Sequence, residues 1–226
     1  MERLPRRLLR HHLPLGLATC AVGLVLYQTR PFPDIIERLS FASAYPALIL
    51  ISATLMIGPS KLIGRKRLPV SVDLRRDLGI WAGTTGVFHA GVGQFVHLRG
   101  RPWLYYVYED WRKEHFMPVR HDMFGLANYS GLLGALILLL LLATSNDVSL
   151  RKFKTAGWKK LQRWNYVCFP LTAFHTFLYQ IGIERQKLPF VATPVAVVIL
   201  TLLIQYQGYR LRTSARPIEV GISRGT

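Results

Sequence analysis

Two histidines, His89 and His175, are the residues of this sequence whose type and placement most suggest chemistry. Each lies inside a long apolar stretch and follows a basic stretch by nearly the same interval, 13 residues after Arg76 and 12 after Arg163. In helices, the two imidazoles would lie about 20 and 18 Å from those basic residues. Ionisable side chains within membrane helices are costly to bury and usually serve a function. Two imidazoles at one depth suggest above all the axial ligands of haem iron.

Other uses of this pair are less well supported. A hydrogen bond to a neighbouring helix would explain either histidine alone, but the matched depth of the two favours a shared ligand. A zinc site needs four ligands, and no Cys, Asp or Glu lies at this level. The sequence contains no G-x-S-x-G, P-loop, H-E-x-x-H or dinucleotide-binding motif. Any chemistry therefore belongs to a bound cofactor, and no catalytic residues are predicted.

The other histidines are weaker candidates. His97 follows His89 by eight residues, which places it about 80° around the same helix, so the two cannot easily share one iron. We expect His97 to contact a haem propionate or the membrane interface. The remaining four are expected to be solvated or interfacial: His11, His12, His115 and His121.

The elements that must position the pair are long apolar segments. The chain has 226 residues, of which 50% are hydrophobic, and a formal charge of +17. A hydrocarbon core of about 30 Å requires roughly 20 apolar helical residues. Lys and Arg lie between the apolar segments, whereas nucleic-acid-binding modules mix basic and aromatic residues on one surface, so no nucleic-acid partner is expected. We predict an all-α polytopic bundle in a lipid bilayer, with six transmembrane helices at about 11–28, 39–57, 78–98, 124–143, 164–183 and 189–208.

The distribution of charge predicts how these helices are oriented. With six spans, 20 of the 29 Lys and Arg residues fall on one side of the membrane and 9 on the other. The positive-inside rule then places both termini in the cytoplasm, in a multi-pass protein of the cell (inner or plasma) membrane. The third and fifth segments run in the same direction, as the equal depth of the histidines requires. The first segment is the weakest, and a retained helix is favoured over a signal peptide because it lacks an A-x-A-like cleavage site.

Small residues line one face of the third segment. They recur at intervals of four, three, four and three, and His89 borders them. Small residues permit close helix packing in membranes, and they also leave space for a flat macrocycle beside the histidine. Either interpretation, or both, can account for the stripe, which consists of Gly79, Gly83, Gly86, Ala90 and Gly93.

Two loops and two cysteines complete the pattern. The loop 99–123 combines Trp and Tyr with charged residues, so we expect it at the exterior headgroup level, with a substrate platform as the less favoured alternative. The basic loop 144–163 is expected to contact anionic lipid, or to receive an acidic partner or a flavin phosphate. Cys20 and Cys168 fall inside apolar segments and are expected to be buried hydrophobic residues.

Together these residues resemble the ferric-reductase-like transmembrane domain family, most of all its haem-binding membrane subunits of methionine-sulfoxide reductase systems. The resemblance implies haem b, electron transfer through the membrane, and His89 and His175 as the ligands. It implies a haem domain over 1–209 and a short basic cytoplasmic tail over 210–226. It is carried by Arg75-Arg76-x-Leu78-Gly79 with His89 ten residues on, by Leu142-Ala143-Thr144-Ser145-Asn146, and by Trp158-Lys159-Lys160-Leu161-Gln162-Arg163-x-x-Tyr166 with His175 nine residues on.

The sequence departs from this family at one position that bears on the number of haems. It has Leu161-Gln162-Arg163 where the family commonly has Leu-His-Arg. Glutamine is not a normal iron ligand, and the matching level of the third segment holds Arg76. We therefore expect one haem per chain rather than two.

The expected role is that of an electron-transfer subunit of an oxidoreductase, not a complete enzyme. The donor is expected to be a membrane quinol or a cytoplasmic flavoprotein, and any FMN or FAD would arrive with that partner because the chain has no flavin domain. The acceptor on the exterior (periplasmic) side would be a partner reductase, ferric iron or oxygen. A haem-free membrane scaffold or assembly protein, and a ferric reductase that acts directly on iron, remain alternatives. A transporter is disfavoured because no broken helices recur in matching halves.

Overall fold

A computed structural model of the protein describes residues 4–30, 32–64, 72–184 and 186–214, and its regular secondary structure in these ranges is helical. All six predicted segments are helical. The first comprises α1 (Leu4–Arg7), the π-helical turn η1 (Leu8–His12) and α2 (Leu13–Thr29). The others are α3 (Ile35–Ile63), α4 (Val72–Gly93), α6 (Met123–Ala143), α8 (Asn165–Phe177) with its π-helical continuation η4 (Leu178–Ile183), and α9 (Leu188–Ser214).

Four of these helices are long and apolar enough to cross a bilayer, so the chain is a membrane protein. They cover Pro5–Thr29, Ile35–Ile63, Met123–Ala143 and Leu188–Ser214. The other two are the helices that carry the histidines. α4 has four charged residues among its first six, and the α-helical part of α8 has 13 residues before the π turn begins. The count of six spans and the side on which the termini lie therefore remain predictions.

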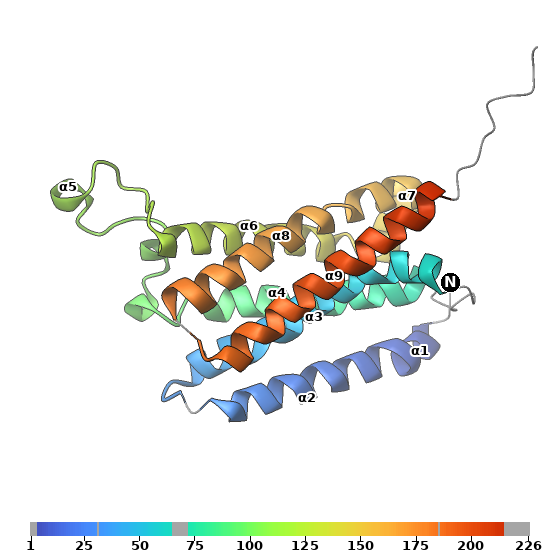
Figure 1. The fold of residues 1–226 in the computed structure, drawn as a ribbon, viewed down its shortest axis with the longest axis horizontal. Helices are drawn as coiled ribbons and strands as arrows, with labels where there is room; N and C mark the ends of the chain where they lie inside the picture. The colour runs from blue at the N-terminus through green and yellow to red at the C-terminus, as the bar shows by residue number, and fades with distance from the viewer. Residues whose placement is uncertain (1–3, 31, 65–71, 185, 215–226) are drawn as a thin grey trace, which may run out of the picture.

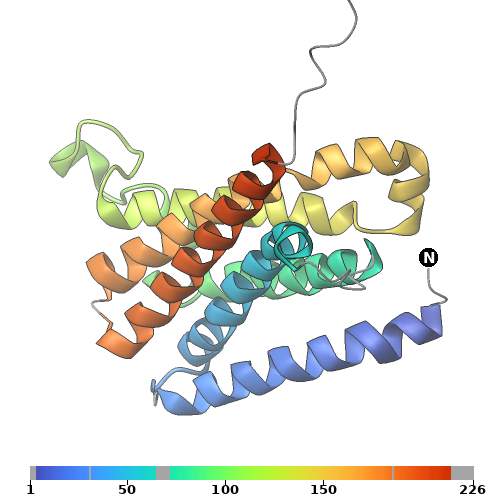
Figure 2. The ribbon, with the colours of Figure 1, turned by 45° about the vertical axis from the view of Figure 1, so that its right-hand side comes forward.

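The helices lie side by side along one long axis (Figure 1). α3 packs against α2, α4, α8 and α9, and α6 packs against α4 and α8. α4 and α8 run in the same direction, from the end that carries α7 (Asp147–Gln162) toward the end that carries the short helix α5 (Trp111–Glu114). The parallel course predicted for the two histidine-bearing helices is thus confirmed. The start of α1 and the end of α9 both lie at the α7 end (Figure 2).

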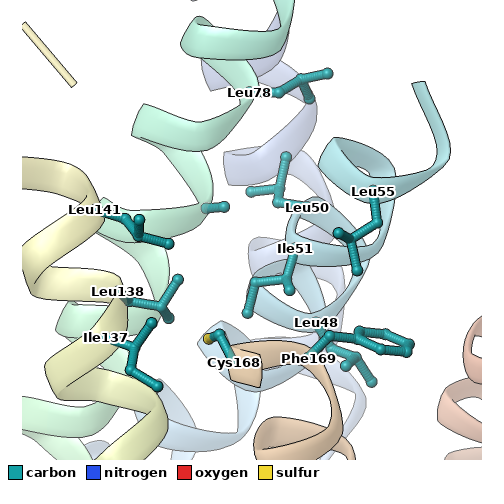
Figure 3. Close-up of a cluster of buried hydrophobic side chains, with 11 residues drawn as sticks. Leu48, Leu50, Ile51, Leu55, Leu78, Ile137, Leu138, Leu141, Cys168 and Phe169 are labelled. Carbon is teal, nitrogen blue, oxygen red and sulfur yellow. The ribbon is translucent and has the colours of Figure 1, made fainter. Parts of the chain in front are cut away.

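The core lies where α3, α4, α6 and α8 meet. Leu and Ile side chains from α3 and α6 surround Cys168 and Phe169 of α8 (Figure 3). Part of the small-residue stripe serves close packing here, since a Cβ at Gly83 would lie 2.9 Å from Leu142 Cβ. Cys168 is buried as predicted, whereas the same prediction for Cys20 is wrong, because its side chain is exposed on α2.

The connection between α4 and α6 is a structured loop at the α5 end. It contains the 3-10 turns η2 (Leu98–Gly100) and η3 (Pro102–Tyr105), helix α5, and an isolated β-bridge between Val107 and Val119. Asp122 then caps the N-terminus of α6, because its side chain accepts a hydrogen bond from the Gly125 N–H at 2.7 Å. Arg120 also holds this carboxylate, at 2.8 Å.

A buried ion cluster fastens the first helix to α4. The carboxylate of Asp77, which has no exposed surface, forms an ion pair with Arg7. It also lies 2.7 Å from His11 Nδ1 and 3.2 Å from His12 Nε2. His11 and His12 are partly exposed at this end of the bundle, with 14% and 21% of their side-chain surface accessible, and their rings contact this acid. The π-helical conformation of Leu8–His12 brings both rings to one acid, which no sequence period predicts.

We expect the Asp77→Asn substitution to destabilise the protein by about 3 kcal/mol, because it removes the carboxylate that is paired with the buried Arg7 guanidinium. Thermal unfolding in detergent, followed by circular dichroism, measures the change. Glu109→Gln is the control, since it breaks the exposed pair with Arg101 and should cost at most about 1 kcal/mol. Equal losses in the two variants would contradict a structural role for the Asp77 cluster.

A loss of stability in acid is expected from Asp122. Burial raises the pKa of this carboxyl, but the hydrogen bonds from Arg120 and the Gly125 N–H outweigh burial, and the net effect is a lowered pKa. A lowered folded-state pKa stabilises the protein above the ordinary Asp pKa of about 4, and this contribution disappears as pH falls through the folded-state value. In a series of unfolding temperatures against pH, Asp122→Asn should flatten the acid limb. An unchanged acid limb would refute the assignment.

Candidate functional site

His89 of α4 and His175 of α8 face each other inside the bundle. Their ring centroids are 6.2 Å apart, and the ring planes cross at 76°. The two imidazoles, which the sequence predicts at matched depth, therefore lie next to each other. It arises because α4 and α8 run in the same direction on either side of α3 and α6.

Each imidazole is oriented by a carbonyl group of another helix. His89 Nδ1 lies 3.0 Å from the backbone carbonyl oxygen of Ser40 in α3, and the Ser43 hydroxyl lies 3.3 Å from the same Nδ1. His175 Nδ1 lies 2.8 Å from the Ala127 oxygen in α6. Because a carbonyl oxygen only accepts hydrogen bonds, each Nδ1 carries a hydrogen, and in the neutral ring Nε2 then keeps its lone pair. Neither Nε2 has a hydrogen-bond partner among the described residues. A histidine that binds a metal through Nε2 has the same arrangement, with its Nδ1 hydrogen donated to a neighbouring acceptor.

Both rings border one cavity of about 500 Å³ between α3, α4, α6 and α8. Its wall near the histidines is built from small residues, including Gly86, Ala90 and Gly131. Gly131 lets α6 approach the His175 ring, since a Cβ there would lie 2.5 Å from His175 Nδ1. The stripe on α4 therefore packs against α6 at Gly83 and Gly86, where Leu142 and Leu138 occupy the space, and it also borders the cavity at Gly86, Ala90 and Gly93.

The spacing of the rings fits a metal ion held between them. A metal–imidazole bond is about 2 Å long and each Nε2 lies about 1 Å from its ring centre, so ligation from both sides separates the centroids by about 6 Å. The observed 6.2 Å matches this requirement. No group of three or more His, Cys, Asp or Glu residues suited to a metal ion occurs in the described ranges. A centre with two protein ligands and its other positions filled by a macrocycle is compatible with this donor set.

The cavity continues past His175 toward the α5 end of the bundle. Tyr179 packs on His175 with 4.9 Å between the ring centroids, and His97 stacks on Tyr179 at 6.3 Å with an interplanar angle of 9°. The Tyr179 hydroxyl donates to Asn128 Oδ1 at 2.9 Å. His97 Nε2 lies 4.0 Å from the Glu184 carboxylate. His97 is thus part of the cavity wall but is separated from the facing pair by Tyr179.

Sequence reasoning missed the polar residues that the π turn η4 presents to this cavity. Tyr179 follows His175 by four residues, so a helical period would have placed both on one face. Gln180 also enters the wall, where its Nε2 donates to the Tyr45 hydroxyl at 3.0 Å and its Oε1 has no hydrogen-bond partner in the described part of the chain. A π turn rotates one more residue onto the inner face than an α-helix does, and the sequence gives no signal for it.

At the cavity's α5 end one aromatic residue of the loop, Tyr106, contributes to the wall. Tyr106 lines the cavity, and its hydroxyl donates to Gln94 Oε1 at 3.2 Å. Burial raises the pKa of the Tyr106 phenol, so it remains a neutral donor at neutral pH. His115 and His121 lie farther out in the loop around Tyr108, with His115 stacked on it at 3.5 Å. Neither belongs to the cavity wall.

The position at which the sequence departs from the family pattern lies at the opposite end. Gln162 is the last residue of α7, outside the membrane-spanning helices, and its Nε2 has no partner among the described residues. Arg76 at the start of α4 is engaged by Asp147 at 2.6 Å. Neither residue lines the cavity that His89 and His175 border.

No family model matches the chain.

We expect Gly131→Ala to disturb the site through the His175 ring. The new methyl group would displace a ring held by Ala127, and overpacking of this kind costs about 1–3 kcal/mol. Gly91→Ala is the matched control, since nothing lies within 4 Å of a Cβ at that position and alanine favours helix. Unfolding temperatures in detergent compare the two. A loss in Gly91→Ala as large as that in Gly131→Ala would contradict the proximity argument.

Proposed function

We propose that the protein is a membrane b-type cytochrome, the electron-transfer subunit of an oxidoreductase, with one haem b held between His89 and His175. The observation that carries this proposal is the state of the two imidazoles. Each donates its Nδ1 hydrogen to a backbone carbonyl of another helix, and each keeps a free Nε2 at a shared cavity with a spacing suited to one metal ion between them. A pair of core histidines with only structural roles would be expected to satisfy both ring nitrogens.

The chain's own residues would contribute orientation and exclusion of water. The carbonyl groups of Ser40 and Ala127 hold the rings at a fixed tautomer and angle, which raises the basicity of each Nε2. The small and apolar residues of the wall keep the surroundings of the rings dry, and a dry environment tunes the potential of a bound haem. Haem iron supplies exchange of one electron at a time.

One haem per chain is the favoured stoichiometry. A second haem nearer the α7 end would need ligands at the levels of Gln162 and Arg76. Glutamine is not a normal iron ligand, and Arg76 is already committed to Asp147. The two positions therefore support a single centre in the cavity.

We further propose that electrons travel from the α7 end, or from the bilayer, toward the α5 end. Six spans with the basic α7 end in the cytoplasm obey the positive-inside rule, which places α5 on the exterior side of the cell membrane. A membrane quinol or a cytoplasmic flavoprotein that brings its own FMN or FAD would be the donor. A partner reductase or a small acceptor on the exterior side would take the electrons.

A reduced-minus-oxidised absorption spectrum of the purified chain tests the cytochrome. We expect a b-type signal with one haem per chain, and we expect it to disappear in both His89→Ala and His175→Ala. His97→Ala is the matched control, since His97 lines the same cavity but is stacked on Tyr179, and the signal should persist in that variant.

Two outcomes would contradict the proposal. A chain produced with ample haem that shows no b-type signal would be a haem-free scaffold or assembly protein. Two haems per chain would show that the level of Gln162 and Arg76 does hold a cofactor.

A further inference from the structure

Helix α7 lies at one end of the bundle, between two helices of the membrane core. It joins α6, which ends at Ala143, to α8, which begins at Asn165, at the end where α1 starts and α9 finishes (Figure 2). A short connection between two such helices must stay close to the level of the lipid headgroups. Trp158 holds it against the end of α6, because this side chain is buried and its Nε1 donates to the Thr144 oxygen at 3.1 Å.

The outward face of α7 carries positive charge that no described residue neutralises. Its single acid, Asp147, is engaged by Arg76. The cations are all exposed, and none forms an ion pair within the described ranges. An exposed surface with this much uncompensated charge favours an anionic partner. The cations are Arg151, Lys152, Lys154, Lys159, Lys160 and, at the C-cap, Arg163.

Exposed apolar side chains lie among these cations. Phe153, between Lys152 and Lys154, is 44% exposed, and Val148 in the first turn is 65% exposed. The helix bends at Lys154, whose φ is 54°, so α7 consists of two short helical segments at an angle. Apolar side chains alternating with Lys and Arg are typical of helices that lie in the plane of the membrane interface, with ammonium groups at the phosphates and apolar groups at the acyl boundary.

We propose that α7 binds the headgroups of anionic phospholipids. The charge alone would also fit an acidic protein, but two further observations favour lipid. Connection to α6 and α8 keeps α7 at headgroup depth, and Val148 and Phe153 have no protein neighbour that covers them. An acidic soluble partner would explain the lysines and leave both apolar side chains unaccounted for. The proposal does not depend on the haem, so either can fail alone.

Native mass spectrometry of the full chain, purified in neutral detergent and mixed with equal amounts of phosphatidylglycerol and phosphatidylcholine, tests this directly. The wild type should retain phosphatidylglycerol preferentially. The preference should fall at high salt, because screening weakens charge attraction. In the triple variant Lys152→Gln, Lys159→Gln and Lys160→Gln, it should fall by roughly fivefold or more, since each cation near an anionic surface contributes substantially to binding.

The matched control removes the same charge from the opposite end of the molecule. Arg112→Gln, Lys113→Gln and Lys187→Gln neutralise three exposed cations there and should leave the preference unchanged. Circular dichroism checks that both triple variants keep their helical content. Equal retention of the two lipids by the wild type, or an equal loss in both triple variants, would overturn the proposal. Lysine-dependent binding of polyglutamate without any preference for phosphatidylglycerol would overturn it in favour of an acidic protein partner.

Discussion

A buried imidazole must find a hydrogen-bond partner, and in this bundle the partners are main-chain carbonyl groups. Polar groups removed from water without a partner cost several kcal/mol, and the Nδ1 atoms of His89 and His175 find their partners in α3 and α6. Carbonyl oxygens have two lone pairs and can accept from a side chain while serving their own helix. The Ser40 and Ala127 carbonyls thereby fix the tautomer of each ring. Each Nε2 is then free to bind a ligand, and the function proposed for the site depends on these two atoms.

Close approach of the helices is the second requirement, and it depends on missing side chains. Gly83 allows α4 to contact α6 at Leu142, and Gly131 allows α6 to contact the His175 ring. Gly86 likewise allows α4 to contact α6 at Leu138, and it also borders the cavity. One stripe of small residues therefore both packs against α6 and borders the cavity.

The two ends of the bundle have different physical characters. At the α7 end, Asp77 pairs with Arg7, His11 and His12 in one cluster, and the cations of α7 are exposed. At the α5 end, aromatic side chains stack from His175 through Tyr179 to His97 and close the cavity. The α7 end therefore carries an excess of positive charge, whereas the α5 end mixes aromatic residues with charges of both signs.

The sequence alone was sufficient for the helical class, the approximate limits of the six apolar segments and the parallel course of the helices that carry His89 and His175. These follow from local composition, from the length of a helical span and from the alternation of direction along the chain, none of which needs a third dimension. That the two rings face each other could not be predicted in the same way. Residue spacing predicts the depth of a side chain along a helix, but it says little about the rotation of the helix about its axis.

Tertiary structure alone decided the rest. His11 and His12 meet Asp77, and Gln180 reaches the cavity, because both segments adopt π-helical turns. A π turn depends on contacts with other helices rather than on residue preference. The choice of the Ser40 and Ala127 carbonyls as partners for the imidazoles has the same origin. Every residue has a carbonyl group, so no residue type marks the two that would be used, and only the packing of four helices around one cavity selects them.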